Sequence, residues 1–139
     1  MAKIKTKFDS LVKLAKLKMD EKEREISKYN NAIELKEKEL QKLKEEYSNL
    51  EYPKEGNFSL ITQFKIMQHN FYNQIRQKET EINMLKNHRD NLVNELKNLN
   101  LEYEKMKYLQ GNEIKKYLNK LKEKEAKELD EIALMLFKG

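Results

Sequence analysis

Residues 8–50 read FDSLVKLAKLKMDEKEREISKYNNAIELKEKELQKLKEEYSNL, and apolar side chains recur in them at alternating steps of four and three residues. The thirteen positions of this stripe read F-V-A-M-K-I-Y-I-K-L-L-Y-L, and eleven of them are apolar if tyrosine is included. Such spacing keeps side chains on one narrow side of an α-helix, as in a coiled coil. The stretch therefore predicts a long helix with one contact seam.

A second stripe of the same kind occupies residues 61–106 and reads I-F-Q-F-I-K-I-L-R-L-L-L-Y-M. Eleven of its fourteen positions are apolar in a chain that is 38% hydrophobic, so the pattern is not a product of composition. Between the stripes lies EYPKEGN (51–57), where Pro53 limits the preceding helix and Gly56 permits a bend. The sequence thus predicts an all-α fold, a long antiparallel two-helix coiled-coil hairpin.

We expect residues 1–139 to form a single hairpin, with helix 1 at about 8–50, a turn at 51–58 and helix 2 at about 59–137. Residues 1–7 look frayed, and Ser59 is the expected N-cap of helix 2. Glycine inside a helix costs about 1 kcal/mol, and the phase of the stripe changes near Gly111. We therefore expect a soft spot at 110–112 in a continuous helix, with a complete break as the alternative.

The symmetry of the two stripes about the turn predicts how the helices pair. The expected opposite residues are Leu50 and Ile61, Tyr47 and Phe64, Leu40 and Phe71, Ile26 and Leu85, Val12 and Leu99, and Phe8 and Tyr103. Lys22 then faces Arg89, a like-charged layer that should be hydrated. A slip of one heptad also preserves the apolar matching, but it requires a turn of different length.

In this pairing the first residue of helix 1, Phe8, lies opposite Tyr103. Helix 2 continues beyond this point for about 34 residues, or roughly 50 Å, and so forms an overhang. The overhang carries its own apolar positions: Ile114, Leu118, Leu121, Leu129, Ile132 and Leu136. An uncovered stripe of this length is normally a contact surface. A second copy of the chain or a different protein could cover it.

The composition argues against a catalytic or metal-binding function for this chain. There is no cysteine, which excludes disulfides, thiolate zinc sites and a cysteine nucleophile. His69 and His88 are nineteen residues apart without a carboxylate at metal-ligand spacing, and no phosphate-binding loop, HExxH motif or serine elbow is present. We expect no enzymatic activity, no metal and no cofactor.

The net charge of +5 is concentrated in residues 1–19, where six lysines oppose Asp9. Such an end favours an acidic partner or an anionic surface, and a merely solvated helix start is an equal alternative. Basic residues dominate no face beyond residue 19, so no nucleic acid is expected. A membrane-surface helix over 8–19 is a further reading, but Leu11 and Leu14 flank the seam, so helix pairing explains most of their apolar character.

The longest apolar run is Ile132–Phe137, six residues where about 20 are needed to span a bilayer, and the N-terminus lacks a signal-peptide apolar region. We therefore expect a cytoplasmic protein, peripheral to a membrane at most. Tyr52, Phe58 and Tyr72 lie at or near the turn and off the seam. They are either anchors for a partner or local packing that stiffens the turn.

The opening Phe8-Asp9-Ser10-Leu11-Val12-Lys13-Leu14, the mid-chain break and the closing residues 124–133 (KEAKELDEIA) resemble FliJ proteins of bacterial flagellar export. The resemblance implies a cytoplasmic component of a type III export apparatus, peripheral at the inner membrane. It implies a rod that inserts into the hexameric export ATPase, stimulates it, and links it to the membrane export gate and to export chaperones. The family has no catalytic residues to carry over.

On this basis we expect two groups of residues to contact the ATPase, the basic residues Lys13, Lys16 and Lys18 and the apolar residues Leu129, Ile132 and Leu136. The turn residues Tyr52, Phe58 and Tyr72 would then face the gate or the chaperones. The residues do not decide which end enters the ring. Two other functions stay open: a coiled-coil scaffold or tether that homodimerises through the overhang, and a nucleic-acid-binding helical hairpin.

Overall fold

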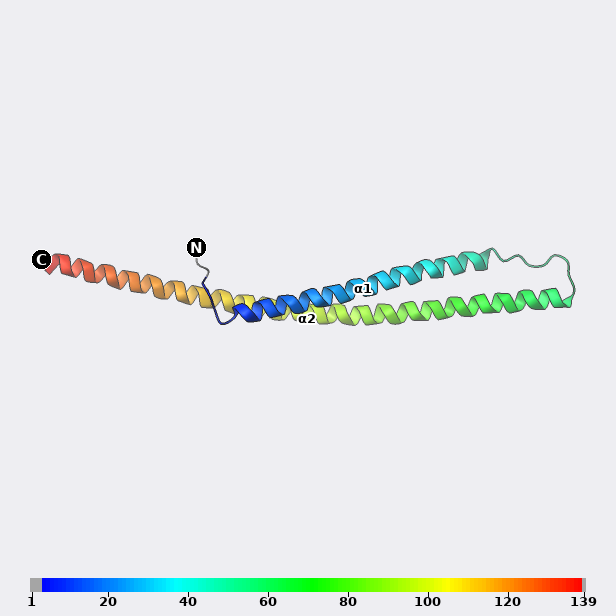
Figure 1. The fold of residues 1–139 in the computed structure, drawn as a ribbon, viewed down its shortest axis with the longest axis horizontal. Helices are drawn as coiled ribbons and strands as arrows, with labels where there is room; N and C mark the ends of the chain where they lie inside the picture. Colours follow the sequence, from blue (N-terminus) through cyan, green and yellow to red (C-terminus); the bar gives the residue numbers. More distant parts are fainter. Residues whose placement is uncertain (1–3, 139) are drawn as a thin grey trace. The chain divides into compact units, whose positions relative to one another are not determined.

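The computed structural model describes residues 4–138. They form two helices, α1 (Asp9–Ser48) and α2 (Phe58–Lys138), joined by residues 49–57 (Figure 1). The helices pack against each other and the described residues contain no strand, which confirms the predicted all-α helical hairpin. Helix 1 ends two residues earlier than expected, and helix 2 begins one residue earlier.

Contacts divide the chain into two compact units, residues 21–96 and residues 1–20 with 97–139. In the first unit the most deeply buried side chains are Ile33, Ile82 and Leu92, which belong to the two apolar stripes. In the second unit they are Ala15 and Met19. Every other apolar side chain of the described residues is at least partly exposed, because two paired helices can cover only one side of each other.

The start of α1 is held by a capping box. The Oγ1 of Thr6 accepts a hydrogen bond from the Phe8 N–H at 3.2 Å and donates one to Asp9 Oδ1 at 2.7 Å. The other carboxylate oxygen of Asp9 accepts the Thr6 N–H at 3.2 Å. These contacts satisfy backbone donors that a helix start leaves unpaired. The expectation that residues 1–7 are frayed is therefore wrong for Thr6 and Lys7, and residues 1–3 lie outside the described part.

The N-cap of α2 is Asn57, whose side-chain oxygen accepts the Leu60 N–H at 3.1 Å. The expectation that Ser59 caps this helix is wrong, because Ser59 already lies within its first turn. Asparagine is as good a cap as serine, so the choice depends on where the loop delivers the chain. A Cβ on Gly56 would come within 2.8 Å of Leu60 Cδ1, which explains a glycine directly before the cap.

The pairing of the helices in residues 21–96 differs from the predicted one. Lys22 bonds Glu95 at 2.8 Å, Lys36 bonds Glu81 at 3.0 Å, and Lys78 bonds Glu39 at 2.9 Å. In each case the partner lies six residues beyond the residue that the predicted pairing places opposite. Allowing for the reach of long side chains, the predicted pairing is wrong by about one heptad.

Two physical causes explain the shift. The lysines within the stripes find glutamates, and the predicted like-charged layer of Lys22 and Arg89 does not form; Arg89 instead donates to Asn30 at 3.3 Å. Polar residues within a coiled-coil seam commonly decide between pairings that apolar residues leave equivalent.

The second cause is the connection 49–57, which continues past the end of α1 alongside the first turns of α2 before the chain reverses (Figure 1). The ring of Tyr52 packs edge-on against Phe64, with centroids 5.1 Å apart. An extended residue advances about 3.3 Å and a helical residue about 1.5 Å, so this loop displaces the helices by several residues. The predicted pairing, with Leu50 opposite Ile61 across a turn at 51–58, included no such displacement.

Helix α2 continues without interruption through Gly111, so the alternative of a complete break is wrong. A Cβ at Gly111 would meet no atom within 4 Å. Beyond Glu113 the helix has no neighbouring element (Figure 1). Every described side chain from Lys115 to Phe137 is exposed. A C-terminal overhang is thereby confirmed, but it begins beyond Glu113, about ten residues later than the expected start after Tyr103.

Candidate interaction surfaces

The first surface lies at the start of α1, where the predicted residues Lys13, Lys16 and Lys18 are all exposed. Lys16 forms an ion pair with Asp20 one turn later, at 3.4 Å. Three leucines beside these lysines are also exposed: Leu11, which precedes Lys13, and Leu14 and Leu17, which lie between the lysines. We call these six residues the N-terminal patch.

The leucines of this patch correct the sequence analysis. Helix pairing leaves Leu11 and Leu14 more than two-fifths exposed, so it does not account for their apolar character. Leu17, which belongs to the same apolar side of residues 8–19, is 59% exposed. The signal was present in the spacing of three residues from Leu11 to Leu14 to Leu17, which leaves the seam on one side of the helix.

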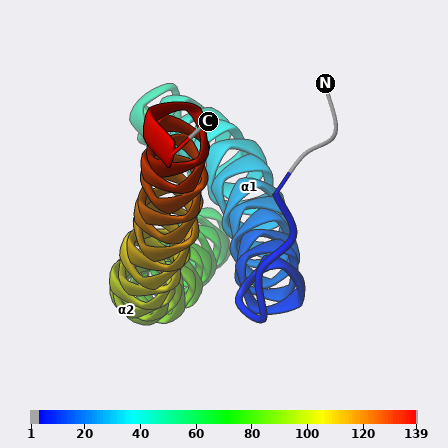
Figure 2. The same cartoon turned by 90° about the vertical axis from the view of Figure 1, so that its left-hand side faces the viewer.

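The start of α1 lies beside α2 (Figure 2), and two polar side-chain contacts, which we call the N-terminal clasp, hold it there. Gln110 Nε2 donates to Asp9 Oδ1 at 2.9 Å, and the Lys7 ammonium lies 3.8 Å from Glu113. The Gln110 hydrogen bond, followed by those from Thr6, lowers the pKa of the Asp9 carboxyl. Asp9 thus joins the helix cap and the contact between helices in one carboxylate.

The second surface is the C-terminal stripe, defined as Ile114, Leu118, Leu121, Leu129, Ile132 and Leu136. Its three predicted contact residues are strongly exposed, with Leu136 at 78%. The structure does not bring this end together with the N-terminal patch. Asp9 lies beside Gln110, and Leu129 follows nineteen residues later, about 30 Å further along the helix.

The third surface lies around the turn, where Phe58 is 84% exposed. A shallow groove begins at this residue and is lined by Phe58, Ile61, Thr62, Lys65, Ile66, His69 and Asn70. Tyr52 packs against Phe64, as the local-packing alternative expected, and its side chain also stays exposed. Tyr72 stands apart, fourteen residues or about 20 Å beyond Phe58, with the Arg76 guanidinium over its ring.

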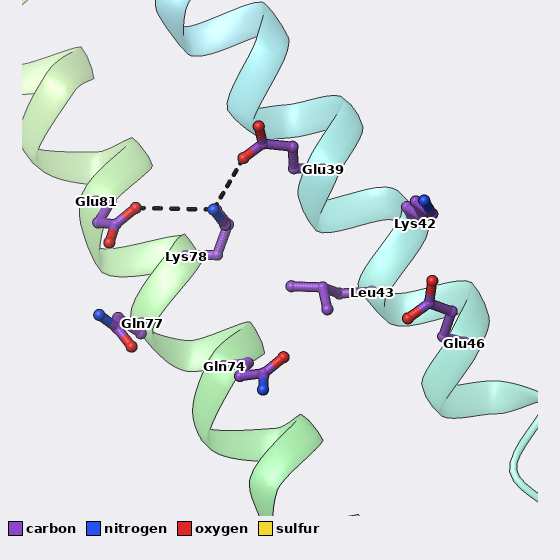
Figure 3. A pocket seen from close by; sticks show the side chains of 8 residues that line it. All are labelled: Glu39, Lys42, Leu43, Glu46, Gln74, Gln77, Lys78 and Glu81. Carbon is purple, nitrogen blue, oxygen red and sulfur yellow. Dashed lines mark hydrogen bonds and ion pairs between the residues drawn. The ribbon is translucent and has the colours of Figure 1, made fainter.

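A polar cleft lies between α1 and α2 (Figure 3). The Lys78 ammonium lies in it between Glu39, at 2.9 Å, and Glu81, at 4.0 Å, while Leu43 is the one apolar lining residue. The hydrogen bond between Lys78 and Glu39 raises the pKa of the lysine and lowers that of the glutamate. Lys36 lowers the pKa of Glu81 in the same way. These charges neutralise one another and form a pairing layer.

Neither histidine lies in a catalytic arrangement. His88 stacks on Tyr29 with ring centroids 4.6 Å apart, which makes it a packing residue, and His69 lines the groove at the turn. Within residues 4–138, no group of three or more His, Cys, Asp or Glu side chains could hold a metal ion. In the same part of the chain, no helix has both the length and the apolar character needed to cross a bilayer.

Comparison with known proteins decides the family. The family model described as "Flagellar FliJ protein" matches residues 4–139, nearly the whole chain. The chain belongs to the FliJ family. Neither the curated proteins nor the solved structures yielded a match.

As a FliJ protein, the chain is a component of the flagellar protein export apparatus. The family is a non-catalytic component of that apparatus, in keeping with a surface that offers contacts rather than an active site. The resemblance seen in the sequence is confirmed, and with it a role in flagellar type III protein transport. The contact residues predicted from it remain predictions.

Proposed function

We propose that this FliJ protein inserts its C-terminal segment into the ring of the export ATPase, stimulates the enzyme, and links it to the export gate and chaperones. The observation that supports this most is the lone end of α2, where every side chain from Lys115 to Phe137 is exposed. A single helix is about 10–12 Å wide with its side chains, much narrower than a helix pair. The lone end is therefore the part that can reach furthest into a pore.

Charge supports the same orientation. Residues 1–20 and 97–139 carry sixteen basic and ten acidic residues, whereas residues 21–96 carry thirteen and fourteen. The excess positive charge thus lies in the unit that contains the lone helix end. With this end inserted, the N-terminal patch, about 30 Å behind Leu129, would meet acidic residues at the mouth of the ring.

Charge reversal in the N-terminal patch tests the contact. The triple variant Lys13→Glu, Lys16→Glu, Lys18→Glu should raise the concentration needed for half-maximal ATPase stimulation by about tenfold or more. A matched control reverses three exposed lysines outside the patch, Lys28, Lys42 and Lys54. Equal stimulation by the two triple variants would reject the assignment of the patch.

The inserted end has a separate test. Replacing Leu129, Ile132 and Leu136 with serine removes the apolar surface and should reduce maximal stimulation, because the exposed residues have no structural role within the chain. Replacing Leu134 with serine is the control, since this residue lies on the opposite side of the helix. Full stimulation by the triple variant would place the ATPase contact elsewhere.

The turn would remain outside the ring and face the export gate or chaperones. Phe58 is its most exposed aromatic residue and borders an apolar groove, the arrangement of an anchor for a partner. Phe58→Ala should weaken capture of the gate or of chaperones by about tenfold, without altering ATPase stimulation. Tyr72→Ala, about 20 Å away, serves as the comparison. Unchanged capture by both variants would remove this role from the turn.

A further inference from the structure

The lone end of α2 carries charges that its own chain does not pair. Residues 21–96 and the N-terminal clasp contain ion pairs throughout, but among the described residues none involves a side chain beyond Glu113. Together with the exposed C-terminal stripe, these charges form a surface that no other part of the described chain covers.

The stripe is symmetric about Glu125. Leu121 and Leu129 lie four residues on either side of it, Leu118 and Ile132 seven, and Ile114 and Leu136 eleven. At about 100° per residue, all of these positions fall within roughly 80° of the helix surface. In an antiparallel pair of identical helices centred on Glu125, each apolar residue of one copy meets its counterpart in the other.

The charges obey the same symmetry. Residues 114–124 contain five lysines and one glutamate, whereas residues 125–136 contain four acidic residues and one lysine. An antiparallel pair places the basic half of each copy on the acidic half of the other, while a parallel pair places like charges together. Lys124 and Glu128 share one flank of the stripe, so each lysine comes close to the glutamate of the other copy.

We propose that two copies of this chain associate through residues 114–136 as an antiparallel helix pair with Glu125 on the two-fold axis. Such an interface uses the same surface on both copies, so it gives a closed dimer and not an open-ended polymer. The two Glu125 carboxylates meet at the axis and repel, and Ile114 is already partly covered by its own chain. The dimer is therefore weak and reversible, with a Kd of roughly 10–100 μM.

The dimer covers Leu129, Ile132 and Leu136, the residues proposed above to enter the ATPase ring. Self-association and insertion then exclude each other, so a second copy and the ring compete for the same surface. The association itself does not depend on the proposed function. It is measured on the isolated protein, so a failure of ATPase stimulation leaves the result unaffected.

Sedimentation equilibrium of the full chain provides the first test. Wild type should show a monomer–dimer equilibrium, and Glu125→Leu should tighten it about tenfold or more by replacing the repulsive layer with an apolar one. Glu123→Leu is the matched control, because residue 123 lies on the opposite side of the helix. A monomer at about 500 μM for both wild type and Glu125→Leu would overturn the proposal.

A charge exchange tests the pairing. Lys124→Glu should weaken the dimer about tenfold, and the double variant Lys124→Glu, Glu128→Lys should restore it, because each copy then presents exchanged signs to the other. Lys116→Glu makes the same charge change on the far side of the helix and should have little effect. Circular dichroism checks that helix content is preserved. A double variant no tighter than Lys124→Glu contradicts the arrangement.

The orientation is tested by cross-linking, which the absence of native cysteine makes unambiguous. Glu125→Cys should form a disulfide between copies on mild oxidation, since residue 125 faces itself. Leu118→Cys should cross-link only when mixed with Ile132→Cys, its antiparallel counterpart. Efficient cross-linking of Leu118→Cys to itself would show a parallel pair and overturn the proposal.

Discussion

Residues 21–96 and residues 114–137 have the same kind of sequence but different surroundings. Both contain an apolar stripe bordered by lysines and glutamates, yet Ile82 is 4% exposed and Ile132 is 53% exposed. The first region has a helix opposite its stripe and its charges are paired; the second has neither. The comparison separates two properties that coiled-coil sequences combine, because burial makes residues 21–96 stable and exposure leaves residues 114–137 able to bind.

The largest expected difference between the regions is in stability. Ile33→Ala should lower the free energy of unfolding by about 2–4 kcal/mol, because it removes a buried side chain from the contact between helices. Leu136→Ala, in the exposed region, should change it by less than about 0.5 kcal/mol. Urea titration followed by circular dichroism measures both. Similar losses would mean that the lone segment is buried in solution.

Loss of the α2 cap should have the next largest effect. Asn57→Ala removes the hydrogen bond to the Leu60 N–H and should cost about 1 kcal/mol. Ser59→Ala should cost almost nothing, since Ser59 lies inside the helix and does not cap it. The same titration ranks the two variants, and the reverse order would show that the helix begins at the residue expected from sequence.

Gly111→Ala should stabilise the helix where it leaves its partner. The position is helical and a Cβ would meet no atom within 4 Å, so about 1 kcal/mol of helix preference is gained without a clash. Hydrogen exchange of the amides around residue 111 should slow by roughly fivefold, with little change in residues 21–96. Unchanged exchange would mean that the glycine is not a soft spot.

Changes in pH should have the smallest effect on stability per group, since the charged side chains of the paired region are all at least partly exposed to solvent. The pKa values of Glu39 and Glu81 are lowered from 4.5, so their stabilisation is present above that pH and is lost as pH falls through the lowered values. The pKa values of Lys22 and Lys78 are raised from 10.5, so theirs is present below that pH and lost above the raised values. Thermal unfolding should be flat from about pH 5 to 10. A slope within this window would require another titrating group.

The sequence predicted the fold because a stripe of alternating steps requires a helix with one buried side. It did not predict the pairing, because apolar layers that repeat every seven residues are equivalent after a shift of one heptad. Which of the shifted pairings forms depends on the ion pairs of Lys22, Lys36 and Lys78 with glutamates of the other helix, and on the length of the extended loop. Neither follows from periodicity.

The exposure of Leu129, Ile132 and Leu136 could be predicted from the sequence, because helix 2 is longer than helix 1 and its far end has no helix opposite. The exposure of the apolar part of the N-terminal patch could not, because Leu11 and Leu14 lie beside the seam and sequence alone cannot show how far a neighbouring helix covers them. Tyr72 was grouped with the turn from its number in the chain, although fourteen helical residues separate it from Phe58.

The contact between Asp9 and Gln110 bears on whether the two helices can slide. A shift of seven residues would preserve the apolar layers but would bring Tyr103 or Tyr117 to the place of Gln110, so the hydrogen bond from the Gln110 amide would be lost. This contact acts together with the lysine–glutamate pairs of residues 21–96 to hold the helices in one register. The length of helix left unpaired beyond Glu113 is then a defined property of the protein, set by polar contacts rather than by the apolar stripes.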